Sequence, residues 1–178
     1  HIGSVKIFGT RRMLELDSGS STITTARGKP ETEKVSLEAI RDVEQRLAIV
    51  LPCKNEDLKV FEGVLSGIPH DCLMIVVSNS SREDIDNFKR EHDVLSQFCH
   101  ETEREALIIH QKDAYIAQAL EDAGYPEILD NTGLVKNGKS EGMIMGIIMA
   151  MLCGRDYVGF IDTDNYIPGA VLEYVKHY

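Results

Sequence analysis

The chain has 178 residues, of which 43% are hydrophobic and 27% charged, and it carries a net charge of −10 with a pI near 5.0. This composition is that of an ordinary globular protein, long enough for one sizeable core and too short to require two. The acidic balance excludes a general nucleic-acid binder, which would need a basic face. Local positive charge, helix N-termini or a metal ion must therefore meet any anionic substrate.

The cysteines and the apolar runs indicate the compartment. The longest apolar run, residues 143–153, contains Gly146 and is well short of a membrane span, so we interpret it as a buried helix. The N-terminus has no basic-then-apolar signal peptide. Four cysteines without C-x-x-C spacing predict reduced, mostly buried thiols in a cytoplasmic protein that contacts no membrane: Cys53, Cys72, Cys99 and Cys153.

The first 45 residues are the least regular part of the chain. Residues 5–8 form a short β-like piece, and residues 11–16 fit either a strand or a helix. Residues 18–34 are rich in Ser, Thr, Gly and charge, which predicts a mobile connection. Apolar side chains at helical spacing predict a short helix over residues 37–45.

From Leu47 onward, apolar runs alternate with helical patterns. The first run ends at Pro52, and the runs are of the length and composition that fill a parallel sheet. The alternation predicts an α/β fold, with a mostly parallel, doubly wound sheet flanked by helices, in a single domain over 1–178 whose core is 47–178. The expected strands are 47–51, 72–77, 106–109 and 157–161, and the expected helices include 58–65, 85–98, 115–123 and 142–153.

Each expected strand runs into a polar segment. In an open α/β sheet, ligands bind outside the carboxyl ends of the strands, so these segments should face one crevice. Loops are usually polar, but four loops that each hold a residue able to bind a nucleotide favour a site. The segments are 52–56, 78–80, 110–113 and 162–165.

The fourth segment places Asp162 and Asp164 one residue apart at the end of a strand. Carboxylate oxygens suit Mg²⁺ or Mn²⁺, and such a cation suits a diphosphate. The two acids also fit a turn or a helix N-cap, because Pro168 looks like the first residue of a helix. A three-residue motif alone leaves both interpretations open.

Residues 133–140, G-L-V-K-N-G-K-S, match the P-loop pattern G-x-x-x-x-G-K-[ST]. A P-loop must join a buried strand to a helix so that its backbone N–H groups wrap the phosphates. The residues before Gly133 include only two consecutive apolar positions, so no buried strand leads into the loop. We interpret the match as chance, although residues 138–142 open a helix that could offer Lys139 and N–H groups to an anion.

Six segments taken together resemble the mannosyl-3-phosphoglycerate synthase family. The likeness covers nearly the whole chain in order, is weakest at residues 18–46, and is most specific in its last block. The segments are 51–56 (L-P-C-K-N-E), 62–70 (E-G-V-L-S-G-I-P-H), 77–80 (V-S-N-S), 110–113 (H-Q-K-D), 138–143 (G-K-S-E-G-M) and 157–171 (Y-V-G-F-I-D-T-D-N-Y-I-P-G-A-V).

The resemblance implies a GT-A fold and a retaining glycosyltransferase. Such an enzyme moves mannose from GDP-mannose to the 2-hydroxyl of 3-phosphoglycerate, a step toward the compatible solute mannosylglycerate, and needs a divalent cation, Mg²⁺ or Mn²⁺. The family's chains continue well beyond the point equivalent to Tyr178, and that part resembles the source of a further histidine metal ligand and of most of the acceptor pocket. The resemblance therefore implies weak or no transferase activity for these 178 residues, and it leaves a homodimer open.

The resemblance also assigns roles to residues by position. Asp162 and Asp164 look like the Asp-x-Asp metal ligands, with Asp164 the more direct ligand and Asp162 nearer the ribose and mannose. Lys139, with these two acids, completes the expected catalytic set. The residues expected to contact GDP-mannose are Pro52, Lys54 and Glu56 in the first guanosine loop, Ser78 and Asn79 in the second, and Gln111, Lys112, Lys139 and Asp162.

Two other functions remain as alternatives to the transferase. A P-loop NTPase would use residues 133–140 and depend on Lys139 and Ser140. A non-catalytic nucleotide-binding module would use its acids and glycines only as caps and turns.

Overall fold

The computed structural model describes residues 37–164 and 169–176. The expectations for residues 1–34 and for Pro168 lie outside these ranges. The elements, in chain order, are α1 (Leu37–Arg46), β1 (Leu47–Cys53), α2 (Leu58–Gly67), β2 (Leu73–Ser78), α3 (Asn87–Thr102), β3 (Ala106–His110), α4 (Ala114–Asp122), the 3₁₀ helix η1 (Pro126–Ile128), α5 (Lys139–Leu152), β4 (Tyr157–Phe160) and α6 (Ala170–Lys176).

The sheet has four strands in the order β3-β2-β1-β4, and every pairing is parallel. In the central strand, Val50 lies beside Ile75 of β2 on one side and Phe160 of β4 on the other. This arrangement confirms the predicted α/β fold with a parallel sheet flanked by helices. Because all the strands run in one direction, their carboxyl ends lie on one edge of the sheet.

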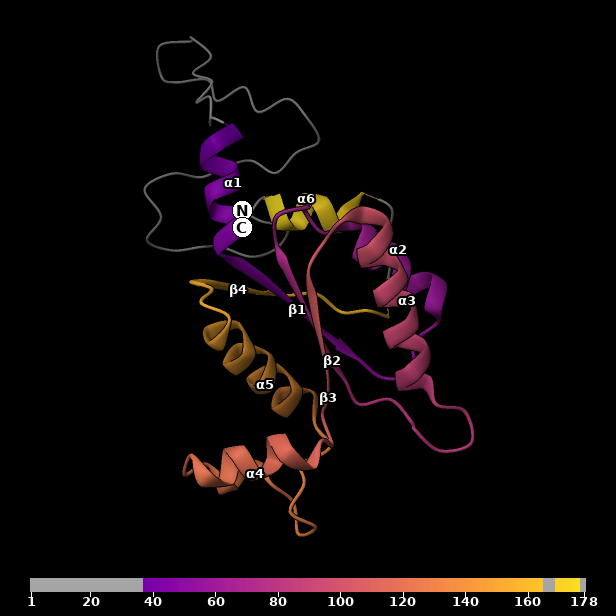
Figure 1. Ribbon diagram of the computed structural model, residues 1–178, viewed down its shortest axis with the longest axis vertical. Helices are drawn as coiled ribbons and strands as arrows, with labels where there is room; N and C mark the ends of the chain where they lie inside the picture. The colour runs from indigo at the N-terminus through magenta and orange to yellow at the C-terminus, as the bar shows by residue number, and fades with distance from the viewer. Residues whose placement is uncertain (1–36, 165–168, 177–178) are drawn as a thin grey trace, which may run out of the picture.

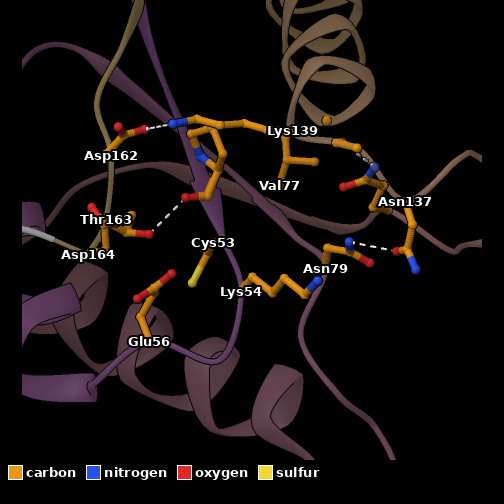
Figure 2. Close-up of a pocket in the computed structure, with 14 residues that line it drawn as sticks. Cys53, Lys54, Glu56, Val77, Asn79, Asn137, Lys139, Asp162, Thr163 and Asp164 are labelled. Carbon is orange, nitrogen blue, oxygen red and sulfur yellow. Dashed lines mark hydrogen bonds and ion pairs between the residues drawn. The ribbon is translucent and has the colours of Figure 1, made fainter.

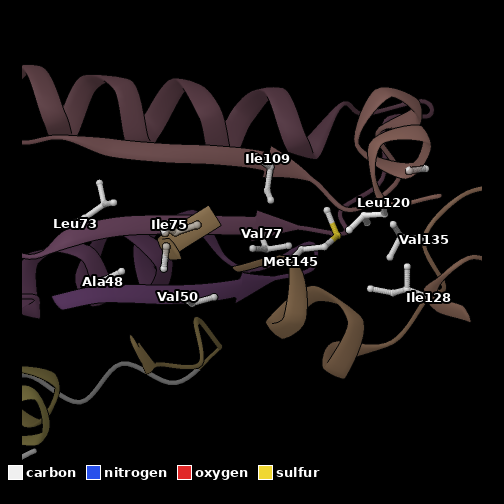
Figure 3. Packing of buried hydrophobic residues seen from close by; sticks show 12 residues of the cluster. Ala48, Val50, Leu73, Ile75, Val77, Ile109, Leu120, Ile128, Val135 and Met145 are labelled. Atoms are coloured by element: carbon white, nitrogen blue, oxygen red, sulfur yellow. The ribbon is translucent and has the colours of Figure 1, made fainter. Parts of the chain in front are cut away.

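Helices cover both faces of the sheet (Figure 1). The side chains alternate along each strand, so Ala48 and Val50 of β1 face α5, whereas Ile49 and Leu51 face α2 and α3. Figure 3 shows the first of these clusters, in which Met145 of α5 packs against the sheet near Val77. The second cluster contains buried residues of α2, α3 and α6. This two-faced burial explains why the strands read as continuous apolar runs.

Strand β1 continues through Pro52, although the sequence predicted that this proline would end it. The Pro52 carbonyl points toward β4, where it accepts a hydrogen bond from the Thr163 hydroxyl at 2.7 Å. The ladder between β1 and β4 has already ended at Val50 and Phe160. Proline has no N–H to donate, but at Pro52 the β1–β4 ladder has already ended and needs no donor on that side. The strand therefore accommodates the proline.

Helix α3 begins later than predicted. Asp86 caps it by accepting a hydrogen bond from the Lys89 amide, so Ile85 precedes the helix and is 58% exposed. Asp57 and Asp113 cap α2 and α4 in the same way. Three aspartates, each just before an apolar helical pattern, thus set where the helices start.

Helix α5 is buried on one face only, which corrects the interpretation of residues 143–153 as a buried helix. Met145 and Ala150 lie in the core, whereas Met151 is 69% exposed. The helix begins at Lys139, with Gly138 as its N-cap. No helix among the described residues is long and apolar enough to span a membrane.

All four cysteines are free, as predicted, but they differ in exposure. Cys53 and Cys72 are buried, Cys99 is half-buried and Cys153 is exposed, so the expectation of mostly buried thiols fails for Cys153. Burial raises the pKa of the Cys72 thiol to about 12 and raises that of Cys53 as well. Both thiols are therefore protonated at neutral pH and suit a structural role.

Gly146 sets the distance between α5 and the sheet. A Cβ atom at this position would lie 2.3 Å from Cγ1 of Val50, which is itself fully buried. Gly146→Ala should therefore force α5 away from β1 and lower the free energy of unfolding by about 1–3 kcal/mol. Chemical denaturation measures this change. Met151→Ala, on the exposed face of the same helix, is the control and should change stability by no more than about 0.5 kcal/mol.

Candidate functional site

A cavity of about 300 Å³ lies at the carboxyl ends of the strands (Figure 2). Segments that are far apart in the sequence contribute to it: the ends of β1, β2, β3 and β4, and the start of α5. The lining residues are Pro52, Cys53, Lys54, Glu56, Val77, Asn79, Gln111, Asn137, Gly138, Lys139, Gly142, Asp162, Thr163 and Asp164.

The loop after β1 brings Lys54 and Glu56 to the cavity. Between them, Asn55 adopts a left-handed conformation with φ of 58°, which asparagine tolerates better than most residues. Its side-chain oxygen accepts hydrogen bonds from the Ser81 amide at 2.8 Å and from Asn87 Nδ2 at 3.0 Å. These bonds fix the turn, so the side chains on either side of Asn55 have defined positions.

The loop after β2 contributes Asn79 but not Ser78. The Asn79 amide donates to the Cys53 carbonyl at 2.8 Å, and its side-chain Nδ2 donates to Oδ1 of Asn137 at 2.8 Å (Figure 2). Ser78 is fully buried, and its hydroxyl donates to Glu91 of α3. Side chains alternate along β2, so Ser78 shares the face of Met74 and Val76 and points toward α3.

Gln111 joins the end of β3 to the segment before α5. Its Nε2 donates to the Lys136 carbonyl at 2.7 Å and to the Gly138 carbonyl at 2.8 Å. A Cβ atom at Gly142 would lie 3.0 Å from Oε1 of Gln111, so a glycine there leaves room for this side chain. Gln111 thus lines the cavity and also holds the backbone that leads to Lys139.

Lys112 lies beside Gln111 but does not line the cavity. Its Nζ donates to Oδ2 of Asp130 at 2.9 Å and to the Val135 carbonyl. The Thr132 hydroxyl, and next the Lys112 ammonium, hold the pKa of the Asp130 carboxyl well below its usual range. Lys112 therefore supports the loop of residues 130–135 from behind the site.

The acidic pair follows β4 and lies on the cavity. Thr163 is 1% exposed and its hydroxyl donates to the Pro52 carbonyl, so it holds the segment against the end of β1. Asp162 and Asp164, on either side of it, are exposed and line the cavity. Oδ1 of Asp162 lies 2.5 Å from Nζ of Lys139 (Figure 2).

Negative charge accumulates on this side of the cavity. Partial burial raises the pKa of the Glu56 carboxyl, and the negative charges of Asp164, Glu91 and Asp162 raise it further. Within residues 37–164 and 169–176, however, no group of three or more acids, histidines or cysteines is arranged to hold a metal ion. Asp162 and Asp164 can offer oxygen ligands, and the other ligands of a cation must come from elsewhere.

Most of the site residues predicted from the sequence line the cavity. All the expected site residues line it except Ser78 and Lys112, which lie behind it. The sequence prediction missed Thr163 and Asn137. Thr163 lies between the two aspartates, and the alternation of side chains was the signal that it would point inward. Asn137 belongs to the segment that the P-loop pattern matched, but nothing in the sequence pairs it with Asn79.

The P-loop alternative has no support in the fold. Residues 133–138 follow η1 with no strand directly before them, and Val135 within them forms an isolated antiparallel bridge with Leu129. This confirms the expectation that no buried strand leads into the loop. Its last residues nevertheless form the start of α5, so Lys139 still belongs to the site.

Comparison with known proteins identifies the family. The model of the family described as mannosyl-3-phosphoglycerate synthase (osmo_MPGsynth) matches residues 1–178. The chain belongs to the mannosyl-3-phosphoglycerate synthase family. A mannosyl-3-phosphoglycerate synthase of Pyrococcus furiosus is 40% identical over 176 residues, which cover 99% of this chain and 44% of the relative. One of Aeropyrum pernix is 35% identical over 177 residues, covering 97% of this chain and 43% of the relative.

The chain spans less than half the length of the mannosyl-3-phosphoglycerate synthases that it matches. These relatives therefore contain further residues beyond the part that this chain matches.

Gln111 provides a test of how the cavity is held together. Gln111→Ala removes the donor of two hydrogen bonds to backbone carbonyls next to α5. We expect the free energy of unfolding to fall by about 1–3 kcal/mol, because these carbonyls lose their partner. Gln118→Ala is the matched control, since that side chain is exposed and bonds only to Asp122 on its own helix. An equal effect of the two variants in chemical denaturation would contradict the role given to Gln111.

Proposed function

We propose that the cavity binds GDP-mannose, and that the complete family protein transfers its mannosyl group to the 2-hydroxyl of 3-phosphoglycerate with retention of configuration. The observation that carries this proposal is the meeting of Lys139, Asp162 and Asp164 at the carboxyl ends of four parallel strands. Ligands of open α/β sheets bind at this edge. Family membership supports the choice of donor and acceptor.

The loops at the strand ends suit a nucleotide. We assign Pro52, Lys54 and Glu56 to the first guanosine loop, and Asn79 and Gln111, which follow β2 and β3, to contacts with the same nucleotide. Amide and carboxylate groups can pair with the hydrogen-bonding edge of a base. Ser78 and Lys112 act from behind the cavity, because their polar atoms are engaged by Glu91 and Asp130.

The carboxylates on the cavity fit a divalent cation such as Mg²⁺ or Mn²⁺. Asp162 and Asp164 would hold it, because hard oxygen donors are the ligands these ions prefer. Three acids lie on one side of the cavity; burial first, and then the negative charges of Asp164, Glu91 and Asp162, raise the pKa of Glu56, and a cation would relieve this repulsion. When bound, the cation supplies positive charge beside the diphosphate.

Lys139 is the residue best placed to meet the charge that develops on the leaving diphosphate. Its ion pair with Asp162 is more than half exposed, at 58% and 55% of the two side chains. Such pairs are worth about 0–1 kcal/mol, so exchanging Asp162 for a phosphate oxygen costs little. Lys139 also lies in the first turn of α5, where the helix dipole favours an anion.

The transfer replaces one bond at the anomeric carbon with another. The bond from this carbon to the phosphate oxygen breaks, and a bond to the acceptor's 2-hydroxyl oxygen forms on the same face. The hydroxyl proton passes to the departing phosphate oxygen. Because the acceptor enters on the face that the leaving group vacates, the route uses no enzyme nucleophile. Lys139 stabilises the phosphate as its negative charge grows, and this stabilisation is greatest at the transition state.

Nucleotide binding tests the donor assignment. We expect GDP-mannose with Mn²⁺ to raise the melting temperature of the chain, by the equivalent of about 2.7 kcal/mol at 100 times the dissociation constant. Asp164→Ala or removal of Mn²⁺ with EDTA should abolish the shift, because the ligand's diphosphate then faces uncompensated acids. Asp122→Ala, an exposed aspartate on α4, is the control. A shift that needs ATP and Ser140 instead of GDP-mannose would favour a P-loop NTPase, and no shift with any nucleotide would overturn the proposal.

Turnover tests how much of the site these residues supply. Lys54 and Lys139 are the basic residues of the cavity lining within the described ranges, and Lys139 already has a partner. An acceptor with a phosphate and a carboxylate needs more positive charge than this. We therefore expect weak or no production of mannosyl-3-phosphoglycerate by the 178-residue chain from GDP-mannose, 3-phosphoglycerate and Mg²⁺. A rate equal to that of the full-length Pyrococcus furiosus relative would contradict this expectation.

A further inference from the structure

Glu91 is a buried carboxylate that the proposed mechanism does not use. It lies on α3 and is 1% exposed. No basic side chain of the described residues forms an ion pair with it. The hydroxyls of Ser80 and Ser78 lie 2.5 Å from Oε1 and 2.6 Å from Oε2, and the Cys53 thiol contacts the carboxyl group as well. Burying a carboxyl group without a basic partner costs free energy. A buried glutamate close to the cavity therefore suggests a function beyond packing.

The two serines that contact Glu91 are also bonded to the backbone. The Ser80 oxygen accepts a hydrogen bond from the Asn55 amide at 2.7 Å, and the Ser78 oxygen accepts one from the Ser80 amide at 3.2 Å. Each serine side chain therefore joins Glu91 to the backbone of a loop at the strand ends.

Ser80 links three strand ends. Its hydroxyl joins Glu91 to Asn55 in the loop after β1, and its carbonyl accepts a bond from Nε2 of His110, the last residue of β3, at 3.0 Å. Nδ1 of His110 accepts a hydrogen bond from the Lys112 amide at 3.2 Å. One serine thus connects the segments that carry Lys54, Asn79 and Gln111 to the cavity.

We propose that Glu91 is a positioning residue for the nucleotide: its carboxylate orients the Ser78 and Ser80 hydroxyls and thereby fixes the loops after β1 and β2. This inference rests on the proposed function. It also explains the placement of Ser78, whose side chain reaches no ligand but carries one of the two bonds to Glu91. Without these bonds the Asn55 amide loses a fixed acceptor. The loops that carry Lys54, Glu56 and Asn79 are then no longer held in fixed positions relative to each other. The negative charge of Glu91 reaches the cavity as well, since it contributes to the raised pKa of Glu56.

Glu91→Gln tests the role with little change in shape. An NH₂ group replaces one acceptor oxygen, so one serine hydroxyl must turn away. We expect the dissociation constant for GDP with Mn²⁺, measured by calorimetry well below the melting temperature, to rise at least ten-fold. Glu101→Gln is the matched control, because this glutamate is exposed on the same helix and accepts only from Gln97. A purely structural role would lower the melting temperature and leave the affinity of the folded protein unchanged, which would overturn the proposal.

The serines keep the proposal testable if Glu91→Gln does not fold. Ser80→Ala removes the link to Asn55 and should weaken GDP binding as much as Glu91→Gln, whereas Ser78→Ala spares that link and should weaken it less. The double variant Glu91→Gln/Ser80→Ala should bind no more weakly than either single variant, because both act on one network. Independent, additive losses would overturn the proposal.

Amide hydrogen exchange separates this inference from the proposed function. If the unaltered chain binds no GDP with Mn²⁺, the proposed function fails, and exchange at the Asn55 amide then decides the role of Glu91. Protection in the unaltered chain that is lost in Glu91→Gln or Ser80→Ala supports the positioning role. Equal protection in all three would overturn it.

Discussion

The parallel pairing of β1 with both of its neighbours is the constraint on which the site depends. Cys53 lies beside Ser78 of β2, whereas the pairing with β4 stops at Val50. The chain leaving β4 therefore passes the last residues of β1, where Thr163 bonds to the Pro52 carbonyl. That bond turns the flanking aspartates to the cavity. The position of the acids is thus a consequence of strand register and of one buried hydroxyl.

The sequence allowed the fold to be predicted because each element is marked by a strong local signal. Fully buried parallel strands appear as unbroken apolar runs, and aspartate caps mark the starts of three helices. The two boundary errors have different causes. Pro52 stays in β1 because the neighbouring strand has ended there, which only the tertiary structure shows. Ile85 is outside α3 because Asp86 supplies the cap, a local signal that the predicted boundary passed over.

The site was predicted less completely, because sequence shows which residues reach a strand end but not where they point. Ser78 and Lys112 both follow apolar runs and carry suitable groups. Ser78 faces α3 because of the alternation along β2, and Lys112 is engaged by Asp130, which lies 18 residues further along the chain. Both partners come from separate elements. For the same reason the sequence does not reveal Glu91. From its position it reads as one more surface acid of an amphipathic helix, and only the fold shows that it is buried against two serines.

The charge distribution explains how an acidic protein can suit an anionic ligand. Within the described lining, Glu56, Asp162 and Asp164 outnumber Lys54 and Lys139. In the proposed function, a diphosphate entering alone would meet net repulsion, and the cavity would discriminate against a nucleotide that arrives without a cation. Glu91 adds negative charge close to Glu56, but it is buried and does not line the cavity. In the proposed function the acids would therefore do more than hold a metal ion: they would make binding of the nucleotide conditional on that ion. In this way an acidic chain can recognise a phosphate ligand without acquiring a general affinity for polyanions.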